Sequence, residues 1–215
     1  MAFEAVIFDY GGVFSSSPFG KAAEAEVKLG IPSGSLTELL GYGLDMPEPA
    51  PGEPYTNKWH QLEVDETTFE EYAEWVADRS EPVFGRRVEI FELLGVGFSS
   101  MGIYWPMVHE ARRLHDAGFK LAICSNNIAS FRSHWQAQIP IEMFDVVIDS
   151  SEVGVRKPDP RIYELTAARL GVAPSAAVFL DDHPANVVGA RAVGMGAVQV
   201  GDPMVAIEEL RALLG

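Results

Sequence analysis

Short apolar runs alternate with longer amphipathic segments over most of the chain. Residues 3–8 (FEAVIF) form the first apolar run, which stops at the turn-forming sequence Asp9-Tyr10-Gly11-Gly12. Such a run predicts a buried strand followed by a loop. Similar runs predict further strands, and the segments beside them predict helices; the strands are at 119–124, 144–148, 176–180 and 196–200, and the helices at 106–117, 128–138, 160–170, 184–193 and 204–214.

Strands that alternate with helices predict βαβ units and a parallel sheet covered on both faces. The predicted fold class is therefore α/β, with a doubly wound (Rossmann-like) parallel sheet. Residues 15–100 interrupt the alternation and contain no convincing strand. They carry helical patterns and one Pro/Gly-rich loop, the helices at 21–29, 35–41, 67–78 and 86–94 and the loop at 46–54. We expect a helical cap domain over 15–100, inserted after the first strand of a core domain that comprises 1–14 and 101–215.

The spacing of Thr67 and Glu70 predicts a capping box at the start of the third cap helix. Charge is concentrated in the same part of the cap. Residues 45–81 hold eleven acidic and two basic side chains, which account for −9 of the formal net charge of −15. This run predicts a solvated outer helix face. The alternative is a cap that disfavours polyanionic substrates.

The net charge limits the kinds of partner that the protein could bind. The 215 residues carry 31 acidic against 16 basic side chains, a field that repels nucleic acid and anionic membrane surfaces. We therefore expect no nucleic-acid or membrane partner. The single cysteine, Cys124, excludes an internal disulfide, and the N-terminal stretch lacks the basic segment of a signal peptide. We expect a cytoplasmic protein; the sequence does not indicate an oligomeric state.

Polar side chains that could take part in catalysis or ligand binding lie at or near the ends of the predicted strands. They are Asp9, Ser125 with Asn126, Lys157, and Asp181 with Asp182. Each alone is an ordinary turn or cap residue. In a doubly wound sheet, however, ligands bind beyond the carboxyl ends of the strands, where these residues would meet.

Four segments around these residues are similar to the four motifs of the haloacid dehalogenase-like (HAD) superfamily. They are VIFDYGGVF (6–14), ICSNN (123–127), GVRKPDPRIY (154–163) and FLDDHPANVVGAR (179–191). Within the superfamily they most resemble phosphatase-type members related to the N-terminal domain of soluble epoxide hydrolase. The resemblance implies a hydrolase that acts on a small phosphomonoester through an aspartyl-phosphate intermediate.

The same resemblance implies roles for individual residues. Asp9 would be the nucleophile, and Lys157 would neutralise charge on the nucleophile and on the transferring group. Ser125, Asn126 and Lys157 would bind or orient the phosphate. Magnesium would be held by Asp9, Asp182 and the backbone carbonyl of Gly11, with Asp181 adjacent, because Mg²⁺ prefers oxygen ligands.

The chain departs from the family pattern at Gly11, where phosphatases of this type usually carry an aspartate that acts as general acid and base. Such a group is typically worth ~10²–10⁴-fold in rate. One alternative is therefore a phosphate-binding relative with weak or no catalysis that acts through protein interactions. Another is that His183 donates the proton. Dehalogenation is disfavoured, because the metal-independent dehalogenases of this superfamily lack an acidic pair such as Asp181-Asp182.

Overall fold

The computed structural model describes residues 3–17, 22–41, 49–50, 53–93 and 102–215. Its centre is a five-stranded sheet with the strand order β3-β2-β1-β4-β5, in which every neighbouring pair is parallel. The strands are β1 (Ala5–Phe8), β2 (Lys120–Ser125), β3 (Val146–Asp149), β4 (Ala177–Asp181) and β5 (Gly196–Gln199). The predicted doubly wound α/β fold is confirmed.

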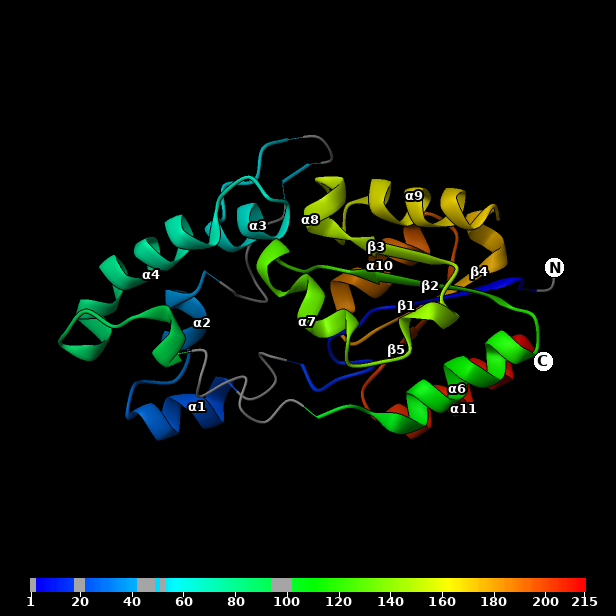
Figure 1. The fold of residues 1–215 in the computed structure, drawn as a ribbon, viewed down its shortest axis with the longest axis horizontal. Coiled ribbons are helices and arrows are strands. Elements are labelled where there is room, and N and C mark those ends of the chain that lie inside the picture. The colour runs from blue at the N-terminus through cyan, green and yellow to red at the C-terminus, as the bar shows by residue number, and fades with distance from the viewer. Residues whose placement is uncertain (1–2, 18–21, 42–48, 51–52, 94–101) are drawn as a thin grey trace.

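Helices cover both faces of this sheet (Figure 1). On one face, α6 (Trp105–Asp116) and α11 (Pro203–Leu214) pack in a cluster that includes Val6 and Phe8 of β1. On the other face, α9 (Pro160–Leu170) and α10 (Pro184–Ala192) pack in a cluster that includes Ala5 and Ile7. Successive side chains of β1 therefore pack against opposite faces of the sheet. Because a central parallel strand is buried on both sides, every position of β1 is apolar.

Shorter helical segments connect the core elements. These are η1 (Ala129–Phe131), α7 (Arg132–Gln136), η2 (Ile141–Met143), α8 (Ser150–Val153) and η3 (Pro174–Ala176). The helix predicted over 128–138 is confirmed only in part, because a 3₁₀ turn, η1, and the short α7 together occupy residues 129–136. Ile128 before them has an extended backbone and a buried side chain. Pro140 restricts the residue before it and so limits continuation beyond α7.

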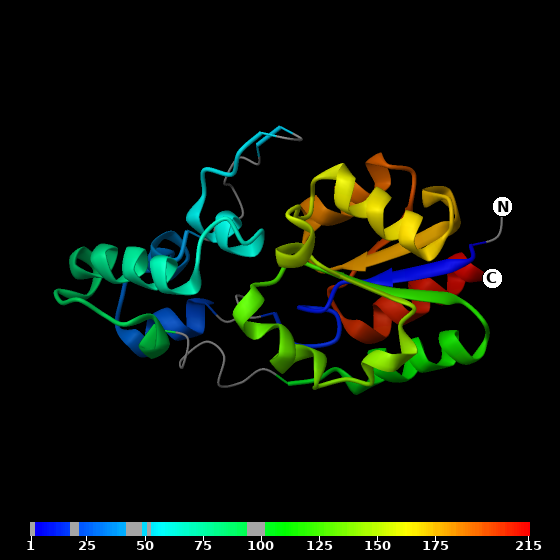
Figure 2. The ribbon, with the colours of Figure 1, turned by 45° about the horizontal axis from the view of Figure 1, so that its top comes forward.

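The helices between β1 and α6 bury a hydrophobic cluster of their own beside the carboxyl ends of the strands (Figures 1 and 2). They include α1 (Ala22–Leu29), α2 (Ser35–Leu39), α3 (Lys58–Glu63) and α4 (Phe69–Phe84), and the described residues 90–93 are helical as well. Ile128 and Phe131, which follow β2, also join this cluster. This arrangement is consistent with the predicted cap; the boundaries proposed at 14/15 and 100/101 stay predictions.

Three details of this region differ from the sequence prediction. Helix α3 was not expected, and α4 extends beyond residue 78 to Phe84. The capping box at the start of α4 is formed by Thr68 and Glu71, one position later than predicted. Residues 42–48, 51–52 and 94–101, which include parts of the predicted loop and of the helical pattern over 86–94, lie outside the described residues.

Candidate active site

The candidate active site lies where β1, β2 and β4 end. Strand β1 pairs with β2 on one side and with β4 on the other, so their carboxyl ends point to the same edge of the sheet. Asp9 follows β1, Ser125 ends β2, and Asp181 ends β4 with Asp182 next to it. The structure thus brings together residues that are more than 170 positions apart in the chain.

Lys157 reaches this edge from the loop between α8 and α9. Its Nζ lies 2.8 Å from Asp9 Oδ1 and 2.6 Å from Asp181 Oδ2. The side chain is fully buried, with the ammonium 5.3 Å from the centre of the Phe179 ring. Burial alone would lower the pKa of this ammonium, but the carboxylates of Asp181 and Asp9 outweigh burial and raise it above the ordinary value. Lys157 is therefore a fixed positive charge at neutral pH.

Asp9, Asp181 and Asp182 form an acidic cluster. One potential ligand atom from each lies within 4.8 Å of the others. Burial raises the pKa of Asp9 to about 6, an effect that Lys157 opposes and Asp181 reinforces. Burial, together with repulsion from Asp9 and Asp181, raises the pKa of Asp182 to about 7. The acidic cluster sets three carboxylates against one ammonium, and its oxygens are the donor type that Mg²⁺ prefers. This donor set fits a divalent cation.

The partners of Asp181 differ from those of the other two carboxylates. Its Oδ1 accepts from the His183 backbone N–H at 2.8 Å, and the amide of Asn186 donates to both carboxylate oxygens at 3.1 and 3.0 Å. Lys157 donates to Oδ2. Asp181 is thus a fully buried acceptor with both oxygens engaged. This suits a residue that holds Lys157 better than one that coordinates a metal directly.

The tight turn after Asp9 brings Gly12 against Asp182. Gly12 has φ of 76°, a left-handed conformation that glycine adopts readily. A Cβ at this position would lie 2.2 Å from Asp182 Cγ. Gly11, in contrast, is not among the residues with positive φ. The second glycine of the pair is therefore required both by the backbone and by its close approach to Asp182.

Asn126 contacts the loop that carries Lys157. Its Nδ2 donates to the Lys157 carbonyl at 3.0 Å, and the Lys157 N–H donates to its Oδ1 at 2.8 Å. Both ends of the Asn126 amide are thereby used to fix the backbone of Lys157. Ser125 is buried beside Asp9, where its hydroxyl is one of the groups that lower the pKa of that carboxyl.

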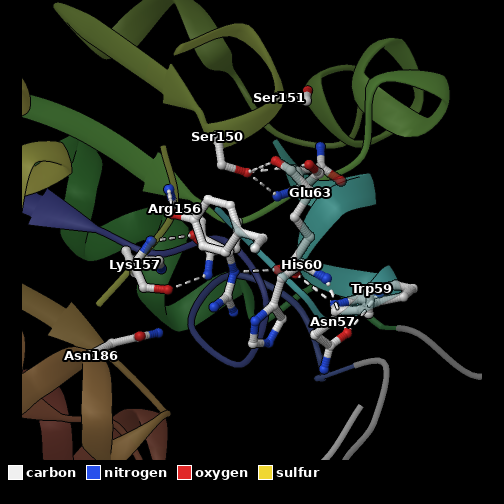
Figure 3. Close-up of polar contacts among 12 residues, drawn as sticks. Asn57, Trp59, His60, Glu63, Ser150, Ser151, Arg156, Lys157 and Asn186 are labelled. Carbon is white, nitrogen blue, oxygen red and sulfur yellow. Dashed lines mark hydrogen bonds and ion pairs between the residues drawn. The ribbon is translucent and has the colours of Figure 1, made fainter. Parts of the chain in front are cut away.

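Some supporting residues were missed by the sequence analysis. Two of them could have been found from their positions in the sequence. Asn186, in the first turn of α10, lies five residues after Asp181, and Gly12 lies next to Gly11. Arg156 and Glu63 carry no such signal, because their buried contact joins positions 93 residues apart. Figure 3 shows Arg156 and Lys157 side by side in the loop before α9.

The fold and this site define a class of protein. A family model for haloacid dehalogenase-like hydrolases matches residues 3–194, and the chain belongs to that family. It is 30% identical over its whole length to pig (Sus scrofa) bifunctional epoxide hydrolase 2, and it spans 39% of that longer protein. It is also 30% identical to "Phosphatase MT3486" of Mycobacterium tuberculosis, over 93% of this chain and 88% of that protein.

A solved structure extends the likeness of fold. A HAD family enzyme from Bacteroides thetaiotaomicron, crystallised with magnesium and inorganic phosphate, superposes with a TM-score of 0.67. The match covers 93% of this chain and 96% of that one at 18% sequence identity. The shared architecture places this chain among the HAD-like folds. In the part of the chain that the structure describes, no helix is long and apolar enough to span a membrane.

Proposed function

We propose that this HAD-like hydrolase is a Mg²⁺-dependent phosphatase of a small phosphomonoester. The observation that carries the proposal is the buried ion pair between Lys157 Nζ and Asp9 Oδ1 at 2.8 Å, set within the acidic cluster. This pair puts a fixed cation against the carboxylate that would attack phosphorus. The phosphatase among the relatives, which this chain matches over most of both lengths, supports the same reaction class.

The reaction would proceed in two displacements at phosphorus. An Asp9 oxygen forms the first new bond to phosphorus as the bond to the leaving alkoxide breaks. Lys157 neutralises charge on Asp9 and on the phosphoryl oxygens, and Ser125 donates to one of those oxygens. Asn126 holds the Lys157 backbone in place. Water then attacks phosphorus, the bond between phosphorus and Asp9 breaks, and inorganic phosphate leaves; one proton of the water passes to the solvent or to the phosphate, and Asp9 is regenerated as a carboxylate. Positioning and electrostatic stabilisation would supply most of the catalysis.

The residues that would hold magnesium are Asp9, Asp182 and the backbone carbonyl of Gly11, with Asp181 beside them. When bound, the cation would screen the repulsion between the Asp9 carboxylate and an incoming phosphate. The acidic cluster places three carboxylates against the single Lys157 ammonium, an arrangement that would favour a divalent cation. A glycine at position 11 keeps the carbonyl that this role needs.

The helices over the strand ends would act as the cap that selects the substrate. The acidic side chains described between Glu53 and Glu81 are exposed, with Glu63 as the exception. They would present a negative outer surface that disfavours polyanions, while the phosphate would be received by Lys157 beneath it. A small phosphomonoester is the substrate class that satisfies both conditions.

Hydrolysis of 4-nitrophenyl phosphate tests the proposal. This ester has a good leaving group and needs little help from a general acid, so the absence of an aspartate at position 11 is a small handicap. We expect turnover with Mg²⁺ and none after the metal is removed with EDTA. An enzyme that is inactive with the metal, or equally active without it, would contradict the proposal; inactivity together with phosphate binding would favour the phosphate-binding alternative.

Gly11→Asp should restore the missing general acid. Because Gly11 is not in the left-handed region, its backbone accepts an L side chain. We expect kcat on alkyl phosphates to rise by as much as ~10²-fold, since this is the low end of what general acid–base catalysis contributes. The gain on 4-nitrophenyl phosphate should be much smaller. An equal gain on both substrates, or none on either, would argue against Gly11 as the site of the missing acid.

Gly12→Ala should displace Asp182 and weaken Mg²⁺ binding, because the new Cβ would collide with the Asp182 carboxyl group. We expect the Mg²⁺ dissociation constant, measured by isothermal titration calorimetry, to rise by about 10-fold. The control is Gly118→Ala. Gly118 has φ of 87°, and a Cβ added there would meet nothing within 4 Å, so it shares the backbone strain without the collision. Equal Mg²⁺ affinity in the two variants would show that the close approach of Gly12 to Asp182 does not affect Mg²⁺ binding.

A further inference from the structure

Glu63 is the one described acidic residue between Glu53 and Glu81 that is buried. It ends α3, and it contacts the core through both its side chain and its backbone. Its carboxylate accepts from Arg156 Nε at 2.6 Å, and its carbonyl accepts from the Ser150 hydroxyl at 2.6 Å. A buried charge is costly unless it is paired, so this residue is held in a specific arrangement.

The Glu63 carboxylate is oriented from its own helix as well. The indole N–H of Trp59, one turn earlier in α3, donates to Glu63 Oε1 at 2.8 Å. One oxygen is thus fixed by α3 while the other receives Arg156. Ser150 in turn accepts from the Asn127 backbone N–H at 3.0 Å. Glu63 therefore lies at a junction of the cap helix α3, the loop after β2, and α8.

Arg156 directly precedes Lys157 in the chain. Its side chain is 8% exposed, and the side chain of Glu63 is 6% exposed, so water screens their ion pair little. The backbone of Lys157 is held from the other side by the amide of Asn126. Figure 3 shows Glu63, Arg156 and Lys157 gathered in one region, with Ser150 adjacent. The lysine loop is thus anchored at Asn126 and at Glu63.

We infer that Glu63 is a positioning residue contributed by the cap: through Arg156 it fixes the Lys157 ammonium against Asp9 and Asp181. The inference rests on the proposed function, in which that ammonium stabilises the transferring phosphoryl group. Its consequence is that part of the catalytic geometry of the core is set by a cap helix. Movement of α3 would therefore change the chemistry and not only access to the site.

An anchor of this kind affects the reaction rate because catalysis depends on the precise placement of the reacting groups. A displacement of about 1 Å at a reacting group can cost 10²-fold in rate. The Lys157 side chain is fully buried and its ammonium is held between Asp9 and Asp181, so a shift of its backbone would change how the ammonium meets the two carboxylates. Loss of the Glu63–Arg156 pair leaves the contacts of Asn126 with the Lys157 backbone in place, so a partial effect is expected.

The test compares Glu63→Gln with Glu110→Gln. Glu110 in α6 is also a buried carboxylate, 2% exposed, and it is paired with Arg211 Nε at 3.1 Å on the opposite side of the core. Both variants neutralise a buried carboxylate that is paired with an arginine, although the Arg211 side chain is 54% exposed and that of Arg156 is 8% exposed; only Glu63→Gln acts on Lys157. For 4-nitrophenyl phosphate, we expect Glu63→Gln to lower kcat by about 10-fold with a smaller change in KM. Glu110→Gln should keep wild-type kcat even if its Tm falls as far.

A second readout does not require turnover. Binding of inorganic phosphate in the presence of Mg²⁺, followed by calorimetry, should weaken in Glu63→Gln but not in Glu110→Gln. In a Lys157→Met background, Glu63→Gln should cause no further loss, because its effect passes through Lys157. If Glu63→Gln fails to fold, Trp59→Phe removes the indole donor to Glu63 while keeping an aromatic ring in the cluster, and it should lower kcat in the same direction by less.

The possible failures are distinguishable. A wild-type protein that binds phosphate without hydrolysing the ester overturns the proposed function, and the phosphate arm still tests Glu63. Wild-type kcat and phosphate affinity in Glu63→Gln overturn the positioning role. An equal kcat loss in Glu63→Gln and Glu110→Gln reduces Glu63 to a stabilising residue and overturns it too. A wild-type protein that neither binds nor hydrolyses overturns both.

Discussion

Replacing Asp9 with asparagine is expected to lower kcat for 4-nitrophenyl phosphate by about 10⁴-fold or more, the scale seen when a covalent nucleophile is removed. The amide has the same shape as the carboxyl group but is too weak a nucleophile to form the phosphoryl-enzyme. The fold should survive, because asparagine removes a buried charge that repels Asp181 and Asp182. We therefore expect Tm to stay the same or to rise in the absence of Mg²⁺.

Asp202→Asn is the matched control for this substitution. Asp202 caps α11 by accepting from the backbone N–H groups of Met204 and Val205, and it is exposed. Asparagine is also a good N-cap residue, so both stability and activity should stay near wild type. Full activity of Asp9→Asn would rule out Asp9 as the nucleophile. A loss of activity accompanied by unfolding would instead assign Asp9 a structural role.

Replacing Lys157 with methionine should have the second large effect, on stability as well as on activity. The substitution leaves Asp9 and Asp181 buried without the cation that contacts both. Breaking a buried ion pair by removing one partner typically costs about 3–5 kcal/mol. The loss of electrostatic stabilisation should lower kcat by about 10³-fold. Denaturant unfolding and steady-state kinetics measure the two effects.

Magnesium should restore part of the lost stability of Lys157→Met, because a ligand that binds only the native state stabilises it by mass action. Lys120→Met is the control. Lys120 Nζ donates to the Leu170 carbonyl at 2.8 Å, away from the carboxyl ends of the strands, so its loss should leave kcat unchanged. If Lys157→Met kept wild-type kcat and stability, the buried cation would have no part in the mechanism.

The sheet and most core helices could be predicted from the sequence, because each local signal agreed with the tertiary structure. The five strands are short apolar runs that end at polar residues, and Asp159 and Gly171 do mark the ends of α9. Prediction failed where tertiary contacts decide the conformation. Helix α3 spans only Lys58–Glu63, too short for a visible period, and it is fixed by packing of Trp59 and Leu62.

The position of the capping box was misplaced by one residue for a local reason. Thr67 and Thr68 are adjacent, and Glu70 and Glu71 are adjacent, so the sequence contains two overlapping candidates. Thr68 and Glu71 form the box, while the Thr67 hydroxyl also donates to the Glu71 carboxylate at 2.9 Å. Thr67 is buried, and Thr68 is exposed at the helix start. Spacing alone could not choose between them.

From the sequence, only the residues of the candidate site that lie at the ends of strands could be predicted. Asp9, Ser125, Asp181 and Asp182 lie at the ends of strands, and topology alone brings them together. The anchors of Lys157 could not be inferred this way. The contact between Arg156 and Glu63 depends on how α3 docks, and the run of acidic residues around Glu63 indicated a solvated face instead. Burial, which decides the role of Glu63, is a property of the folded chain.

Trapping the covalent intermediate tests the central claim most directly. 4-Nitrophenyl phosphate has a good leaving group, so the first displacement should be fast and should load Asp9 with the phosphoryl group during turnover. Quenching the reaction with borohydride reduces an aspartyl-phosphate to homoserine, which peptide mass spectrometry can locate. If Asp9 is the nucleophile, homoserine will be found at position 9, and its formation will depend on both Mg²⁺ and 4-nitrophenyl phosphate. Active turnover with unmodified Asp9, or with the label on another carboxylate, would contradict it.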